Sequence, residues 1–220
     1  MPNWITNKVQ APSHVIKAML NTEGRVDLNK VQSFPGPNNS WDGIYSDAET
    51  AAEAVLGIPI SGHSMIALFQ KDNRGRINIQ SMPERSFQQF VGMLENYRAC
   101  GYLHAMEFAR SEWGTKWNAC ESKADPDNGI CQFDTAWNCP DRFFLKLSKQ
   151  FHDDEITVAY ADEDIGCNCG TITLKAGEIV TADVAPAYKD QSEADRSKWA
   201  AFAYQVKGWE PEPEDDDEAA

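Results

Sequence analysis

The chain lacks the sequence features that define several large classes of protein. Its 220 residues contain no run of about 18 apolar residues, so the sequence predicts no membrane-spanning helix. The opening Met-Pro-Asn-Trp-Ile-Thr has neither the charged region nor the apolar stretch of a signal peptide. We therefore expect a cytoplasmic protein whose six cysteines are free thiols rather than a disulfide framework.

Catalytic and metal-binding motifs are also missing. The sequence contains no G-x-S-x-G, H-E-x-x-H or P-loop, and its four histidines are scattered. Cys167 and Cys169 are separated by one residue, which is not a zinc-site spacing. The acidic loops 125–129 and 162–166 lack the glutamate that closes a calcium loop. We predict no metal, no cofactor and no catalytic residue, and leave open an active site assembled from distant segments.

Basic residues are too few to balance the acidic ones. The chain holds 34 aspartates and glutamates against 20 lysines and arginines, a net charge of −14. Residues 1–110 hold ten of each sign, whereas residues 111–220 hold 24 acidic and ten basic residues, and seven of the acidic ones lie in 210–218. Nucleic-acid binding needs cations along the phosphate backbone, so we expect no direct nucleic-acid partner. A basic macromolecular partner is favoured instead.

The N-terminal half shows a mixture of helical and strand patterns. Residues 4–9 and 26–34 have strand patterns on either side of a short helix that begins at Ser13, which predicts a first β-α-β unit. Further on, Ser46 and Glu49 predict a capping box for a helix that ends at Gly57. The remaining elements expected in this half are a β-hairpin formed by 64–70 and 76–80, a helix over 87–100 and a helix over 103–113.

The C-terminal half repeats the β-α-β pattern. A strand over 130–137, a helix opened by Pro140 and a strand over 155–160 form the second unit. A hairpin over 170–182 and an amphipathic helix from Ser192 to Gly208 follow. Two β-α-β units in one sheet predict an α+β protein with the ferredoxin-like split β-α-β arrangement. The Glu-Pro-Glu-Pro-Glu-Asp-Asp-Asp tail cannot bury a core, so we expect it to be disordered.

These elements suggest four segments along the chain. Residues 1–34 would form the N-terminal β-α-β unit, and residues 35–115 an insertion of helices and a hairpin. Residues 116–208 would form the ferredoxin-like C-terminal domain, followed by the acidic tail at 209–220.

Three short stretches carry a family resemblance. They are the Trp113-Gly-Thr-Lys-Trp117-Asn segment, the Phe133-Asp-Thr-Ala-Trp137 strand and the Tyr160 to Gly170 loop, together with the opening Met-Pro-Asn-Trp. With these residues the chain resembles the YubB-like proteins of phages and conjugative plasmids. The resemblance implies a ferredoxin-like domain in the C-terminal half and a phage or plasmid origin, but no reaction.

The tryptophans of these stretches allow two interpretations. Trp113, Trp117 and Trp137 could form a stacking platform for a ligand, but large aromatic residues are more often buried, so we expect core anchors. Lys116 and Asn118 are then the functional candidates of the segment, because a lysine between two anchored tryptophans has little structural purpose.

Two acidic clusters bracket the strand at 155–160. They consist of Asp153, Asp154 and Glu155 at one end and Asp162, Glu163 and Asp164 at the other. The rise of a strand places them roughly 25–30 Å apart, where carboxylates can imitate a phosphate track. The alternative interpretation is a solvated surface with a solubilising tail. The phage or plasmid habitat implied by the resemblance favours mimicry.

These observations lead to one functional hypothesis and two alternatives. The chain would block a host nucleic-acid-binding defence complex, of the anti-CRISPR or anti-restriction type, by occupying its basic groove. Alternatively, Lys116, Asn118 and the loop 166–170 would form a small-ligand or nucleotide-binding domain, with or without catalysis. A third interpretation is a plasmid or phage accessory protein without an inhibitory role.

Overall fold

The computed structural model describes residues 2–211, which form two compact units. The first, here called the sheet unit, comprises Met1–Ser33 and Ala109–Ala220, and the second, the helical unit, comprises Phe34–Phe108. The acidic segment 212–220, where most of the expected disordered tail falls, lies outside the described residues.

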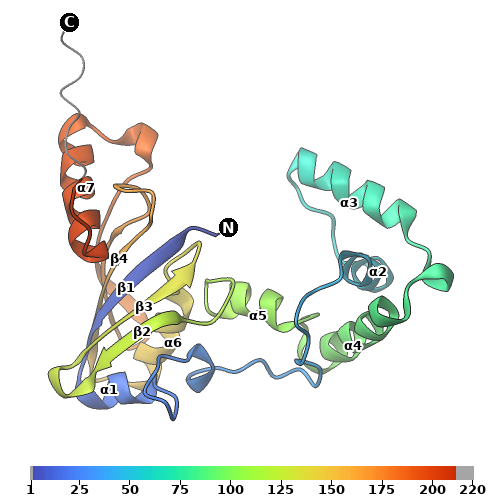
Figure 1. Ribbon diagram of the computed structural model, residues 1–220, viewed down its shortest axis with the longest axis horizontal. Coiled ribbons are helices and arrows are strands. Elements are labelled where there is room, and N and C mark those ends of the chain that lie inside the picture. Colours follow the sequence, from blue (N-terminus) through green and yellow to red (C-terminus); the bar gives the residue numbers. More distant parts are fainter. Residues whose placement is uncertain (1, 212–220) are drawn as a thin grey trace, which may run out of the picture. The chain divides into compact units, whose positions relative to one another are not determined.

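The sheet unit contains a six-stranded antiparallel sheet in the order β2-β3-β1-β4-β5-β6 (Figure 1). Its strands are β1 (Trp4–Gln10), β2 (Cys120–Asp125), β3 (Ile130–Ala136), β4 (Glu155–Ala161), β5 (Gly170–Lys175) and β6 (Glu178–Val184). β1 lies between β3 and β4, so each crossover, β1-α1-β2 and β3-α6-β4, is split by one strand. The helices of these crossovers are α1 (Ser13–Ala18) and α6 (Asp141–Gln150). This arrangement confirms the α+β, ferredoxin-like fold class.

The second strand of the first crossover is not where the sequence placed it. Residues 26–34 hold only the short 3₁₀ helix η1 (Leu28–Lys30) and one bridge between Val26 and Leu20. Their alternating pattern arises because this loop buries Val26 and Leu28, not because it pairs in the sheet. The true partner is β2, whose Cys-Glu-Ser-Lys-Ala-Asp sequence is too polar to show a strand pattern.

The helical unit is inserted between α1 and β2. It contains α2 (Ser46–Leu56), α3 (Ser64–Arg76), the 3₁₀ helix η2 (Ile79–Ser81) and α4 (Glu84–Cys100), and α5 (Ala105–Glu112) begins within it. Its core is formed by three alanines of α2 and by large residues of α4 and the following turn: Ala48, Ala51, Ala52, Phe90, Met93 and Leu103. Gly57 and Gly101 end α2 and α4 in the left-handed conformation, as the sequence predicted.

Two predictions for the helical unit are wrong. Most of the segment 64–80, where a hairpin was expected, forms the helix α3. The Asn-Arg-Gly75 sequence predicts a turn between strands, but it lies near the C-terminal end of this helix. No residue of α3 is buried. The expected capping box at Ser46 is absent, since the helix begins one residue earlier, with Tyr45 as the cap and no side-chain hydrogen bond to it.

The two faces of the sheet are covered differently. Large apolar residues of α6, β3, β4 and β5 form the main core on one face: Phe133, Phe143, Phe144, Leu147, Ile156 and Leu174. On the other face, α7 (Glu193–Lys207) packs Trp199, Ala203 and Val206 against Ala161 and Cys169 (Figure 1). Ser192 opens α7 with a complete capping box. The part of this face formed by β2, β3 and β1, here called the open face, carries polar side chains.

Candidate functional site

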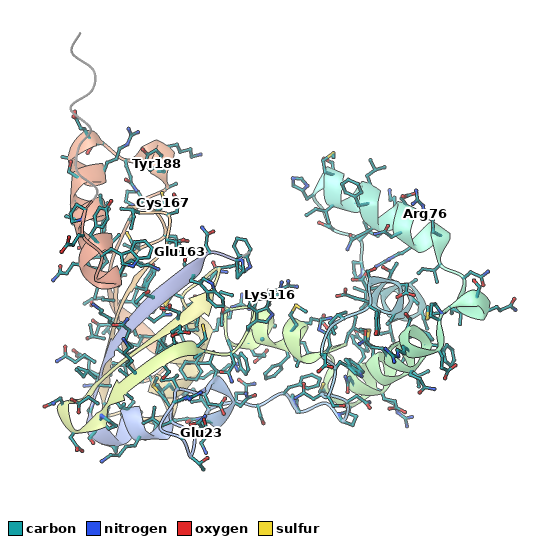
Figure 2. All side chains as sticks on the ribbon, in the orientation of Figure 1. Glu23, Arg76, Lys116, Glu163, Cys167 and Tyr188 are labelled. Carbon is teal, nitrogen blue, oxygen red and sulfur yellow. The ribbon has the colours of Figure 1, made fainter. Side chains whose placement is uncertain are left out.

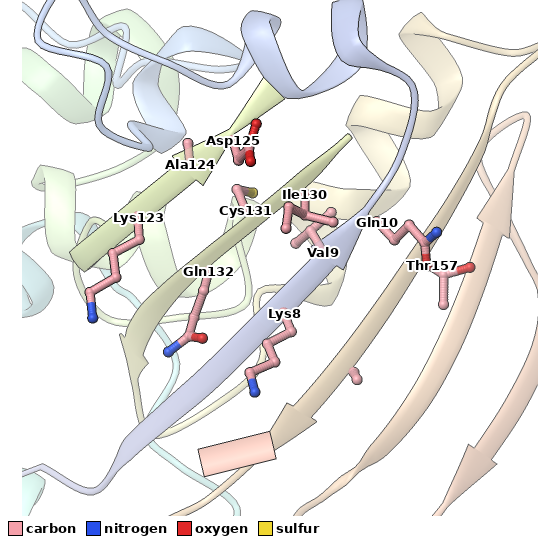
Figure 3. A pocket seen from close by; sticks show the side chains of 11 residues that line it. Lys8, Val9, Gln10, Lys123, Ala124, Asp125, Ile130, Cys131, Gln132 and Thr157 are labelled. Carbon is pink, nitrogen blue, oxygen red and sulfur yellow. The ribbon is translucent and has the colours of Figure 1, made fainter. Parts of the chain in front are cut away.

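A row of two lysines and a glutamine crosses the open face. In the register of the sheet, Lys123 of β2 is opposite Gln132 of β3, which is opposite Lys8 of β1. Their side chains point in the same direction from the three neighbouring strands (Figure 3). The strand spacing of about 4.8 Å puts the Cα atoms of the two lysines roughly 10 Å apart. Antiparallel pairing thus brings together cations that are far apart in the sequence.

This row borders a hollow of about 560 Å³ on the open face. Its second row consists of Asp125, Ile130, Gln10 and Thr157, which are cross-strand neighbours (Figure 3). Ile130 is 47% exposed, so the hollow has an apolar patch beside polar side chains. The arrangement can hold a ligand that combines negative charge with an apolar body.

The three side chains of the row differ in their burial and in their hydrogen bonds to the rest of the protein. Lys8 is half-buried, and its Nζ donates a hydrogen bond to the backbone carbonyl of Gln205 in α7, 3.1 Å away. Lys123 is exposed and forms no ion pair with another described residue. Gln132 likewise forms no side-chain hydrogen bond within the described part of the chain. Lys123 and Gln132 are therefore available to a ligand, and Lys8 keeps two further N–H donors.

A cluster of aromatic residues lies where β1 begins. The rings of Trp4 and Trp117 are tilted by 43° with centroids 6.1 Å apart, and the Lys116 ammonium lies 4.5 Å from the Trp117 centroid. Lys207 donates a hydrogen bond to the Trp4 carbonyl, at 3.0 Å. Lys116 thus has a cation–π contact with Trp117 and is not among the residues that line the hollow.

Only one of the three tryptophans expected in the core is there. Trp113 is 5% exposed and its indole N–H donates to the Gln32 carbonyl at 2.9 Å, which confirms the prediction for this residue. The prediction is wrong for Trp117 and Trp137, which are 39% and 46% exposed. Trp137 follows the last residue of β3 with a φ of 72°, so it leaves the strand direction before its side chain can enter the core.

Asn118 makes structural hydrogen bonds through both the oxygen and the nitrogen of its side-chain amide. Its Oδ1 accepts hydrogen bonds from the backbone N–H groups of Leu28 and Ala119, at 2.8 and 2.9 Å. Its Nδ2 donates to Asp27 at 2.8 Å. Burial of Asp27 raises the pKa of its carboxyl, but hydrogen bonds from Asn118 and Asn29 outweigh burial and leave that pKa below its usual value. Asn118 therefore fixes the loop that holds η1.

The loop 166–170, expected to accompany Asn118 in a ligand site, is also used internally. Gln191 Nε2 donates to the Gly166 carbonyl at 3.0 Å, and Cys169 is buried beneath α7. Asn168 Nδ2 donates to Asp162 and to the Trp137 carbonyl. Asn118 and Asn168 line different hollows, Asn118 beside Asp27 and Asn168 beside Asn138.

The two acidic clusters do bracket β4, but two of their members are not free for a partner. Asp162 is 6% exposed and accepts hydrogen bonds from Asn3 and Asn168, at 3.1 and 3.0 Å. Asp154 Oδ2 lies 2.7 Å from His14 Nε2. Both side chains hold neighbouring segments in place, and the role of the two clusters in partner binding stays a prediction.

The other four carboxylates of these clusters are exposed. They are Asp153, Glu155, Glu163 and Asp164, two at each end of β4. Glu163 accepts a hydrogen bond from the Trp4 backbone N–H at 3.1 Å through one oxygen. Figure 2 shows Glu163 at the end of the sheet where Cys167 also lies, whereas Glu23 lies at the opposite end.

Asp134 is an acidic residue of the open face that the sequence did not single out. It lies two residues beyond Gln132 on β3, opposite Thr6 of β1. Burial raises the pKa of its carboxyl, although a hydrogen bond from Thr6 and the charge of Lys207 act against this. Asp134, Gln132 and Ile130 occupy alternate positions of β3 and therefore share one face of the sheet. This pattern points to Asp134 only when that face is known to be open.

Thiol and carboxylate groups do not converge on a metal position. Among residues 2–211 there is no group of three or more His, Cys, Asp or Glu side chains that could hold an ion. Burial raises the pKa of the Cys131 thiol to about 12 and that of Cys169 to about 11, so both are protonated at neutral pH. All six cysteines are free thiols, as predicted. No helix in the described part of the chain has the length and apolarity needed to cross a membrane.

Comparison with known proteins supports the fold assignment. Residues 112–201 match the family described as "Ferredoxin-like domain in Api92-like protein". Residues 112–201 are therefore similar to a ferredoxin-like domain, in agreement with the strand order of the sheet unit. The chain is also similar to the crystal structure of protein api92 from Yersinia pseudotuberculosis, with 13% identity and a TM-score of 0.39 over 85% of this chain and 99% of that one. A search of curated proteins finds no match. Neither match carries the YubB-like name, which stays a prediction.

Proposed function

We propose that this chain is a binding protein whose acidic C-terminal half occupies the basic nucleic-acid-binding groove of a host complex. The observation that supports this most directly is the pair of exposed carboxylates at each end of β4. The seven residues of β4 span roughly 23 Å, several times the spacing of phosphates along one nucleic-acid strand. The finer proposal is a defence complex of the CRISPR or restriction type, and its support is the family resemblance alone.

Charge favours a basic partner over a nucleic acid. The excess of acidic residues lies wholly in residues 111–220, with 24 acidic and ten basic side chains. Rim charges of this kind speed up association with a complementary surface and set its salt dependence. Binding to such a partner requires no covalent chemistry.

The experiment is affinity purification from a bacterial lysate at low salt, with mass spectrometry of the retained proteins. Three forms are compared: the parent, a quadruple charge reversal at the ends of β4, and a matched reversal in the helical unit. The first variant replaces Asp153, Glu155, Glu163 and Asp164 by lysine, and the second does the same at the exposed Asp42, Asp72, Glu84 and Glu95. Both change the net charge by the same amount.

We expect the parent and the control to retain the same nucleic-acid-binding protein and the first variant to lose it. Added duplex DNA should displace that protein from the parent, because both would compete for one groove. Equal retention by the first variant, or no displacement by DNA, would contradict the proposal. Circular dichroism of all three forms shows whether the substitutions leave the fold intact.

A further inference from the structure

We propose that the open face of the sheet unit is a binding site for a small organic phosphate of mononucleotide size, held by Lys123, Gln132 and Lys8. The site uses residues of β2, β3 and β1, and none of the four exposed carboxylates at the ends of β4. It is therefore independent of the partner-binding function proposed above.

The charges of the row fit one phosphate group. Lys123 and Lys8 flank Gln132, and no carboxylate lies between them in the register of the three strands. Two ammonium groups on flexible stems, with Cα atoms roughly 10 Å apart, can approach one phosphate from both sides. The Gln132 amide adds an N–H donor at the centre.

The neighbouring row fits the uncharged part of such a ligand. Ile130 offers an exposed apolar surface next to Gln132 on the same side of β3, and a planar ring can rest on it (Figure 3). Gln10 and Thr157 border this surface with an amide and a hydroxyl that can bond to ring nitrogens or sugar hydroxyls. The hollow of about 560 Å³ lies within the size range of ligand pockets.

The surroundings limit the length of the ligand. Asp134 lies two residues beyond Gln132 on β3, and Asp125 lies two residues beyond Lys123 on β2, so a carboxylate flanks the lysine row on each side along the strands. A continuing phosphate backbone would run into these carboxylates, whereas one phosphate group stays between them. The two rows contain no aromatic residue on which successive bases could stack. Both features favour a single nucleotide over a strand.

The experiment is calorimetric titration at low ionic strength with AMP, GMP, CMP and UMP, the corresponding nucleosides, inorganic phosphate and a single-stranded RNA oligonucleotide. The variant Lys123→Gln carries the test, because this exposed side chain makes no ion pair within the described residues. Lys189→Gln is the matched control, an exposed lysine of the same unit in the 3₁₀ helix η4 (Tyr188–Asp190). Lys8→Gln is a second variant, which also removes the bond to Gln205.

We expect at least one nucleotide to bind at least tenfold more tightly than its nucleoside. Lys123→Gln should weaken that binding at least tenfold, while Lys189→Gln binds like the parent. Backbone amide shifts induced by the nucleotide should be largest in β2, β3 and β1. The proposal is overturned if nucleotides and nucleosides bind alike or not at all, or if only the oligonucleotide binds. It is also overturned if Lys123→Gln and the control Lys189→Gln bind the nucleotide equally well.

Discussion

Replacing Trp113 and Trp137 by alanine in separate variants tests the packing of the sheet unit. The Trp113 side chain is 5% exposed, and its loss removes a buried indole and leaves the Gln32 carbonyl without its 2.9 Å hydrogen bond. Truncation of a buried tryptophan costs about 3–5 kcal/mol of unfolding free energy. Trp137 is 46% exposed, so its replacement should change that free energy by no more than about 0.5–1 kcal/mol.

Urea unfolding followed by tryptophan fluorescence separates these values. Of the seven tryptophans only Trp41 lies in the helical unit, so six report on the sheet unit. With a urea dependence of about 1–3 kcal/mol per M, Trp113→Ala should lower the midpoint by at least about 1 M. Trp137→Ala should leave it nearly unchanged. The reasoning is refuted if both variants shift the midpoint equally, or if Trp137→Ala shifts it more.

Two aspartates should show opposite pH effects in thermal melts between pH 3 and pH 7. Burial raises the folded-state pKa of Asp134, so Asp134→Asn should stabilise the protein at pH 7, with an advantage that is lost as the pH falls through that raised pKa and is gone below 3.8. Burial acts to raise the pKa of Asp27, but hydrogen bonds from Asn118 and a neighbour outweigh it and keep that pKa below 3.8. Asp27→Asn should therefore destabilise the protein above pH 3.8, and this loss of stability should shrink at lower pH. Parallel pH profiles would contradict this. Gly129→Ala should lower the free energy of unfolding by at least about 1 kcal/mol, and with it the melting temperature. The reason is that Gly129 has a φ of 69° and that a Cβ there would lie 2.5 Å from the Ala11 carbonyl oxygen.

The sequence predicted the elements that follow simple rules. α6, β4, the β5-β6 hairpin and α7 have clear periodicity and end signals such as the Ser192 capping box, and all are present. β2 was missed because it is a short, polar edge strand, and α3 was mistaken for a hairpin because Gly75 resembles a turn signal. In each case the local pattern gave no information about the tertiary neighbours that decide the outcome.

The candidate site was less accessible to sequence analysis than the fold. Lys8, Gln132 and Lys123 lie in three strands, and only the order β2-β3-β1 and its register make them neighbours. One signal was present, since Trp4, Thr6, Lys8 and Gln10 alternate with the buried side of the first strand. Lys116 and Asn118 were chosen from a motif, and in the structure Asn118 holds the loop around η1 in place.

The central position of β1 has a consequence for synthesis on the ribosome. β1 pairs with β3 and β4 and is the first strand of the chain, yet Thr6 meets Ala161 across a separation of 155 residues. At about 5–20 residues per second, the second partner emerges roughly 8–30 s after β1. Until both β3 and β4 have emerged, the apolar Ile5 and Val9 cannot enter the complete sheet. The nascent chain therefore offers a window for chaperone capture, and its folding rate should be set by these late, long-range pairings.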